Sequence, residues 1–139
     1  MTHQIHHKGH CRCGSVDITA TGEPQLCVYC HCDDCRRATG APLLAAVGFE
    51  KQAIVWNSAS TLSRYTAGSA SRLFCNNCGS PVAQEHKSAD HMTFFNTGFM
   101  DEPERYPPTY HTFAGRQISW LKMHDDLPRT DATLMIKPD

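Results

Sequence analysis

Short runs of apolar and β-branched residues, separated by polar or Gly- and Pro-rich turns, make up most of this chain. Residues 15–20 alternate apolar and polar side chains, as a half-buried strand does. No segment keeps a helical period of useful length. The pattern predicts a mainly β fold, with further strands at residues 26–29, 43–49, 54–56, 62–65, 72–74, 82–85, 92–96, 110–113 and 118–121.

One segment departs from this pattern. Residues 36–40 are expected to form a turn or a short helical fragment, ended by Gly40 and Pro42. The cysteines that precede it are therefore placed in a loop at the end of a strand. Four aromatic side chains are expected in the core: Trp56, Phe94, Phe95 and Trp120.

Length and charge narrow the function classes. At 139 residues, without an internal repeat or a plausible linker, the chain is interpreted as one domain, residues 1–139. A net charge of -1 does not favour nucleic acid or an anionic membrane as partner, but leaves a small-molecule ligand open. The sequence contains neither a membrane-spanning apolar run nor the apolar stretch of a secretory signal, so a cytoplasmic location is expected.

Seven of the eight cysteines occur as C-x-C, C-x-C-x-x-C and C-x-x-C, and Cys27 is the eighth. In the cytoplasm thiols are kept reduced, and cysteines two or three positions apart are poorly placed for an unstrained disulfide with each other. The same spacing turns two thiolates toward one metal ion. The cysteines are therefore interpreted as metal ligands rather than as disulfides.

Two separated pairs have the composition of a closed zinc site. Structural zinc takes four ligands, and two pairs supply them: Cys11, Cys13, Cys75 and Cys78. The second pair encloses two asparagines and is followed by Gly79, which lets the backbone curl so that amides point at sulfur. One structural zinc ion is expected here.

The central triplet, Cys30, Cys32 and Cys35, is one ligand short of four. That count is typical of catalytic zinc, which keeps one position for water or substrate. Cys27 offers an alternative, since it would complete a closed site with four thiolates. His31 lies between two of the ligands and is expected to point to the opposite side, in a supporting or surface position.

The charged residues beside the triplet allow two readings. Arg36 and Arg37 are candidates to bind a carboxylate of a substrate or to offset thiolate charge, and a solvated surface pair is the alternative. Asp33 and Asp34 are expected to be turn residues rather than a paired acid and base.

The N-terminus is rich in histidine and is expected to be a solvated segment rather than a metal site. Its histidines are His3, His6, His7 and His10.

Three motifs together carry a resemblance to a known family. They are GHCRCGSV at residues 9–16, CHCDDCRRATG at residues 30–40 and FCNNCGS at residues 74–80. In this combination the chain resembles the glutathione-dependent formaldehyde-activating enzyme family, which includes centromere-protein-V-like proteins. Residues 98–101, 107–120 and 126–128 look like the C-terminal half of that family, so the resemblance extends over nearly the full chain.

The resemblance implies an Mss4-like β-tent of short antiparallel strands pinned by zinc. It implies a structural zinc on the two cysteine pairs, a catalytic zinc on the triplet, and carbon-sulfur lyase activity that forms or cleaves S-(hydroxymethyl)glutathione from formaldehyde and glutathione. The expected partner is then a small-molecule thiol or its aldehyde adduct. A zinc-stabilised binding module without catalysis is the alternative, with zinc storage or sensing as a third hypothesis.

Overall fold

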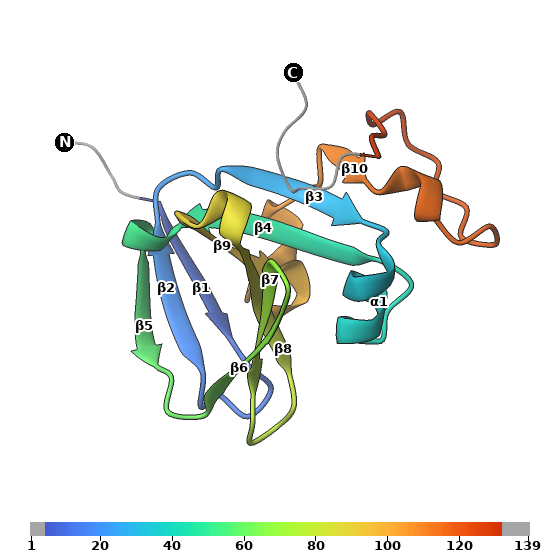
Figure 1. Ribbon diagram of the computed structural model, residues 1–139. Coiled ribbons are helices and arrows are strands. Elements are labelled where there is room, and N and C mark those ends of the chain that lie inside the picture. Colours follow the sequence, from blue (N-terminus) through green and yellow to red (C-terminus); the bar gives the residue numbers. More distant parts are fainter. Residues whose placement is uncertain (1–4, 132–139) are drawn as a thin grey trace.

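The computed structural model describes residues 5–131, which form two sheets (Figure 1). The three-stranded sheet has the order β1–β2–β5 and is antiparallel. The seven-stranded sheet has the order β10–β3–β4–β9–β8–β7–β6 and is antiparallel except for the parallel β10–β3 pair. The predicted mainly β fold is confirmed.

The strand bounds follow the predicted apolar runs closely, except that β1 was not predicted. They are β1 (His6–His10), β2 (Asp17–Thr21), β3 (Leu26–Cys30), β4 (Leu44–Glu50), β5 (Ile54–Ser58), β6 (Leu62–Ala67), β7 (Ala70–Cys75), β8 (Pro81–His86), β9 (Met92–Asn96) and β10 (Tyr110–Thr112). Short 3-10 turns connect several of them: η1 (Lys51–Ala53), η2 (Lys87–Ala89), η3 (Thr97–Phe99), η4 (Pro103–Arg105) and η5 (Ala114–Arg116).

Helix α1 (Asp33–Thr39) lies between the end of β3 and the start of β4 (Figure 1). It begins at Cys32, whose sulfur accepts a hydrogen bond from the Cys35 amide at 3.2 Å. Asp33 and Asp34 occupy the first turn, where negative charge favours a helix. Gly40 ends the helix at φ 72°, a left-handed conformation that glycine adopts without strain.

The principal core lies between the two sheets. On the seven-stranded sheet the register places Cys27, Val47, Phe95 and Ala83 in one row across four strands. These side chains pack in one cluster with Val16, which precedes β2, and with buried residues of the smaller sheet, among them Ile18, Ala20 and Ile54. Burial of this face is the main hydrophobic contribution to the fold.

The opposite face of the seven-stranded sheet carries a second cluster. Val28, Cys30, Ala46 and Phe94 lie on it and pack with Cys35 from α1. Because side chains of a strand alternate between faces, neighbouring cysteines of β3 enter different clusters. Cys27 faces the principal core, and Cys30 faces the helix.

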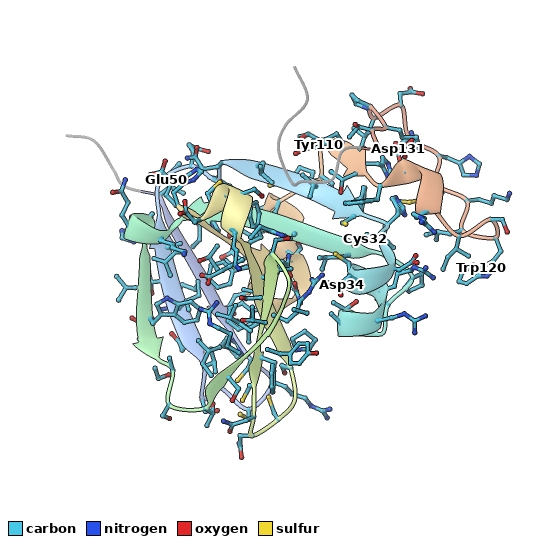
Figure 2. The ribbon with its side chains drawn as sticks, viewed as in Figure 1. Cys32, Asp34, Glu50, Tyr110, Trp120 and Asp131 are labelled. Atoms are coloured by element: carbon cyan, nitrogen blue, oxygen red, sulfur yellow. The ribbon has the colours of Figure 1, made fainter. Side chains whose placement is uncertain are left out.

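The predicted strand at residues 118–121 is wrong. This segment is a turn within the C-terminal arm that extends away from the sheets, and Trp120 is 68% exposed (Figure 2). Its expected place in the core is therefore also wrong. The run has strand-forming residues, but no described strand pairs with it.

The described N-terminal histidines lie in a strand, in which His6 and His10 are exposed as expected and His7 is not. His6, His7 and His10 lie in β1, and His3 lies outside the described residues. His7 is buried, with Nδ1 2.7 Å from the Tyr106 hydroxyl and Nε2 2.7 Å from the Gly22 carbonyl oxygen. Sequence alone did not reveal these partners, because Tyr106 is distant along the chain.

Among the described residues, no helix is both long enough and apolar enough to cross a membrane.

Gly48 allows β4 to pack closely against side chains of β9, and a substitution at this position tests that packing. A Cβ at this position would lie 2.9 Å from Cδ1 of the buried Phe94 ring and 2.7 Å from the Met92 Cε. We expect Gly48→Ala to lower the free energy of unfolding by about 1–3 kcal/mol in urea denaturation. Gly98→Ala is the control, since its Cβ would meet nothing within 4 Å. Equal stability of the two variants would contradict this packing.

Candidate metal centres and the adjoining cavities

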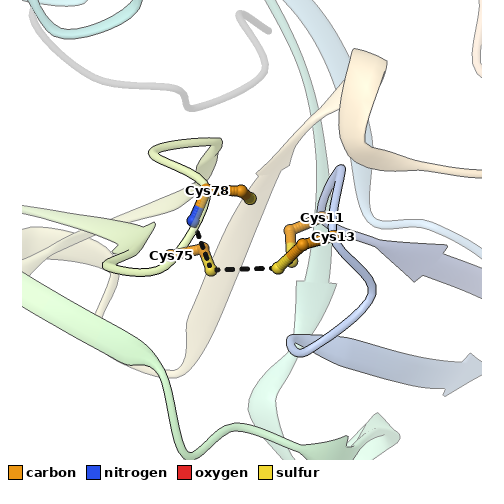
Figure 3. Close-up of side chains that lie close together, drawn as sticks. All are labelled: Cys11, Cys13, Cys75 and Cys78. Atoms are coloured by element: carbon orange, nitrogen blue, oxygen red, sulfur yellow. Dashed lines mark hydrogen bonds between the residues drawn. The ribbon is translucent and has the colours of Figure 1, made fainter.

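Four cysteines from two distant loops meet at one place (Figure 3). Cys11 and Cys13 lie between β1 and β2, and Cys75 and Cys78 lie at the turn between β7 and β8. One ligand atom from each lies within 4.8 Å of all the others. The arrangement joins the small sheet to the large one. We call these residues the four-thiol cluster.

Backbone and side-chain amides point at the sulfurs of the four-thiol cluster. The Val16 amide lies 3.3 Å from the Cys11 sulfur, and the Cys78 amide lies 3.5 Å from the Cys75 sulfur (Figure 3). The Asn77 side chain donates to Cys13 at 3.3 Å. Such donors stabilise thiolates, and therefore favour metal ligation.

The thiols of this cluster differ in proton affinity. Burial raises the pKa of Cys75, but hydrogen bonds from Ser15 and Thr61 more than offset it and bring the value to about 5. The Ser15 hydroxyl lowers the pKa of Cys13 to about 7, whereas burial raises the pKa of Cys11. Neighbouring thiolates repel each other, so ionising all four requires a cation. The donor set fits zinc.

The triplet Cys30, Cys32 and Cys35 forms a second, smaller group. Cys30 ends β3, Cys32 caps α1, and Cys35 lies within α1 rather than in the predicted loop. The Cys35 sulfur lies 3.3 Å from the Cys30 sulfur, and all three sulfurs fall within 4.8 Å of one another. No other His, Cys, Asp or Glu among residues 5–131 joins this group.

Cys27 lies away from the triplet. Its side chain packs against the principal core on the opposite face of the seven-stranded sheet from Cys30. Burial raises the pKa of the Cys27 thiol to about 11, so it stays protonated. Cys27 is therefore not placed to close the second site, and this argument for a binding module without catalysis is removed.

Charge is distributed unevenly over the triplet. Hydrogen bonds with Cys30 and then Cys35 lower the pKa of Cys32 to about 2, whereas hydrogen bonds with Cys30 and then Cys32 raise the pKa of Cys35. The guanidinium of Arg72 lies beside them, with Nη2 3.4 Å from the Cys35 sulfur. Arg72 was missed by sequence reasoning, because its position in β7 carries no motif.

The arginines predicted to bind substrate, Arg36 and Arg37, lie in α1 but not on the wall of the cavity beside the triplet. Arg36 is paired with Asp33 at 2.5 Å, while Asp34 is paired with Arg72. Both aspartates thus act as ion-pair partners on α1. Neither Arg36 nor Arg37 lines the cavity at the triplet. Binding of a carboxylate by these arginines stays a prediction.

A cavity of about 300 Å³ opens beside the triplet, and we call it the thiol cavity. One of its walls carries His86, whose Nε2 is buried and has no hydrogen-bond partner among residues 5–131. Burial lowers the pKa of His86, so the imidazole is neutral at pH 7. No motif in the sequence identified His86 as a candidate site residue. The lining residues are Cys30, Cys32, Asp34, Cys35, Ala67, Ser69, Ala70, Arg72, His86 and Phe113.

A second cavity, of about 340 Å³, adjoins the thiol cavity and shares Asp34 and Arg72 with it. We call it the side cavity. It lies between α1 and strands β6–β9, and Arg37 is on its wall. Its other lining residues include Ala38, Tyr65, Phe74, Pro81, Gln84 and Asn96.

A buried pair of histidines, His31 and His111, lies next to the triplet. His31 is fully buried, so a surface position is wrong, and its Nε2 lies 2.8 Å from Nδ1 of His111. His111 contacts the Asp125 carboxylate at 3.2 Å. Burial and then His111 lower the pKa of His31 to about 4. This chain of contacts anchors the C-terminal arm to the strand that carries Cys30.

Comparison with known proteins agrees with this geometry. The model of the glutathione-dependent formaldehyde-activating enzyme family matches residues 6–116. The chain belongs to this family. The resemblance drawn from the three cysteine motifs is thus confirmed, and the matched span of this formaldehyde-activating enzyme family contains every cysteine of the chain.

Two relatives extend the comparison. A Schizosaccharomyces pombe protein named an uncharacterized lyase is 28% identical over 91 residues, which span 65% of this chain and 65% of that protein. A crystal structure of a Rhodobacter sphaeroides protein matches with a TM-score of 0.54 at 26% identity, covering 68% of this chain and 87% of that one. Family and fold therefore agree.

Metal content tests both cysteine groups. We expect about two zinc ions per chain, one in each group, and about one after Cys30→Ser, measured by elemental analysis of folded protein. Cys27→Ser is the matched control and should retain both ions, because Cys27 faces the other side of the sheet. One zinc ion per chain that Cys30→Ser leaves unchanged would contradict the second site.

Proposed function

We propose that this protein is a zinc-dependent carbon-sulfur lyase that forms or cleaves the adduct of a small thiol with an aldehyde. The observation that carries the proposal is a three-thiol group open to a cavity, in a chain of the formaldehyde-activating enzyme family. S-(hydroxymethyl)glutathione is the adduct that the family description suggests.

The triplet supplies three of the four ligands that zinc prefers, and it lies beside the thiol cavity. Cys30, Cys32 and Cys35 would hold the ion, which would supply Lewis-acid stabilisation of a substrate thiolate. Arg72 offsets the negative charge of these ligands through its contact with Cys35. We assign the four-thiol cluster to a second zinc ion with a structural role.

Cleavage of the adduct requires a base for its hydroxyl group. When the hydroxyl proton leaves, the carbon-oxygen double bond forms, the carbon-sulfur bond breaks, and its electron pair stays on sulfur. His86 is the neutral imidazole on the wall of the thiol cavity, and its Nε2 has no other partner. We assign it to accept this proton and to return it in the reverse direction.

Arg37 is the second assignment for the substrate. It lines the side cavity rather than the thiol cavity, which suits a carboxylate at the far end of a peptide thiol. Arg36 is held by Asp33 and is the weaker candidate of the two.

Turnover of S-(hydroxymethyl)glutathione tests the proposed activity. We expect the zinc-loaded protein to release formaldehyde saturably, and Cys32→Ser to lower kcat/KM by about 100-fold or more, since one ligand of the catalytic zinc is lost. Cys27→Ser should keep the wild-type rate. Release no faster than in the uncatalysed solution, with both zinc ions bound, would contradict the proposal.

The pH profile tests His86. Because the base must be unprotonated and burial lowers its pKa, kcat should hold its plateau to a pH below the ordinary histidine value of about 6.5 and fall only under further acidification. We expect His86→Gln to lower kcat by about 100-fold and to abolish this acid limb, with zinc content unchanged. His91→Gln, at an exposed histidine outside both cavities, is the control. An unchanged profile would exclude His86 as the base.

A further inference from the structure

The side cavity contains polar groups that neither the fold nor the proposed reaction uses. Three of its lining residues, Tyr65, Arg72 and Gln84, lie opposite one another on neighbouring strands of the seven-stranded sheet, in a row that continues to Phe94. Phe94 packs in the cluster that contains Cys30 and Cys35. The row therefore lies on the face of the sheet that carries the triplet.

The side-chain NH2 group of Gln84 is a buried hydrogen-bond donor without an acceptor among the described residues. The residue is 1% exposed, and its Oε1 accepts a hydrogen bond from Arg72 Nη1 at 3.4 Å. A guanidinium only donates, so this contact determines which end of the carboxamide is oxygen. The remaining Nε2 is buried without a partner. Since buried amide groups almost always have partners, a ligand acceptor is the natural complement.

Asn96 adds a hydrogen-bond acceptor to the same cavity. Its Oδ1 is buried and has no partner, and Asn96 lines the side cavity together with Gln84. The two residues lie on adjacent strands, where Gln84 is paired with Phe94 and Ala83 with Phe95. Two residues of the cavity wall thus carry one donor and one acceptor that are unpaired among residues 5–131, and the C=O and N–H of one amide group would satisfy both.

The surroundings favour a neutral amide over a carboxylate. Arg72 is the cation beside Gln84, and it is already paired with Asp34 and in contact with Cys35. Apolar rings flank the cavity, since Tyr65 is 66% exposed and Phe74 is 36% exposed. A carboxylate beside Gln84 and Asn96 would meet uncharged amides there, and its desolvation would be poorly compensated.

Arg72 also connects Gln84 to the triplet. One guanidinium contacts both the Cys35 sulfur and the Gln84 oxygen, and the two cavities share Arg72 and Asp34. A ligand with its sulfur at the triplet thus reaches Gln84 with a group only a few bonds away from that sulfur.

We propose that the side cavity binds an amide group of the thiol substrate, close to its sulfur. Gln84 Nε2 donates to the amide oxygen, and Asn96 Oδ1 accepts the amide N–H. This inference rests on the proposed function for the position of the sulfur. It adds the amide to the carboxylate assigned to Arg37 as a group by which the protein selects its thiol.

Binding to the full zinc-loaded chain is the first arm of the test. N-acetylcysteamine is the probe because it carries one amide and no charge, and 2-mercaptoethanol is the thiol without an amide. We expect N-acetylcysteamine to shift the side-chain NH2 resonance of Gln84, which is assigned by its loss in Gln84→Met. 2-Mercaptoethanol should leave that resonance in place. No shift with either thiol would overturn the amide site.

Kinetics with the hydroxymethyl adducts of both thiols form the second arm. One lost hydrogen bond predicts that Gln84→Met raises KM for the N-acetylcysteamine adduct about fivefold to tenfold and leaves the 2-mercaptoethanol adduct unchanged. Gln52→Met, at an exposed glutamine outside both cavities, is the matched control.

The two proposals fail in different ways. Turnover of both adducts with equal KM, unaffected by Gln84→Met, would overturn the amide site and leave the lyase function intact. Absence of turnover for both adducts would overturn the lyase function. A specific Gln84 shift with N-acetylcysteamine in the same sample would then still support the amide site.

Discussion

The crowding of cysteine sulfurs is the constraint on which the structure depends. Four thiols from two loops lie within 4.8 Å of one another and join the three-stranded sheet to the seven-stranded sheet. Uncompensated thiolates at this separation repel each other, and thiols alone contribute only weak contacts. A divalent cation would convert that repulsion into a link between the sheets, which is why we propose a structural role for it.

Strand alternation explains why the second group stays one ligand short. Cys27 and Cys30 are both in β3, but they are an odd number of residues apart and so face opposite sides of the sheet. Cys27 enters the principal core, and Cys30 meets the first turn of α1. The same short helix presents Cys35 to the triplet and Asp34 to Arg72. The separation of Cys27 from the triplet is thus a consequence of ordinary β geometry.

The sequence was sufficient for the strands and for the grouping of cysteines, because both are recorded in local spacing. It failed where tertiary partners decide. Residues 118–121 have strand propensity but no pairing strand, and β1 is stabilised partly through His7, whose partner Tyr106 is distant in sequence. Arg72, Gln84 and His86 were also missed, since their importance arises only when β7 and β8 are laid beside α1.

The central claim is that the triplet holds a zinc ion with a position for the sulfur of the substrate. X-ray absorption at the zinc edge measures it directly, as the mean number of sulfur ligands per zinc. The account predicts a rise from about 3.5 to about 4 when the thiol substrate is added, because one of two sites gains a sulfur. A mean of about 4 before addition, or no change after it, would contradict the account.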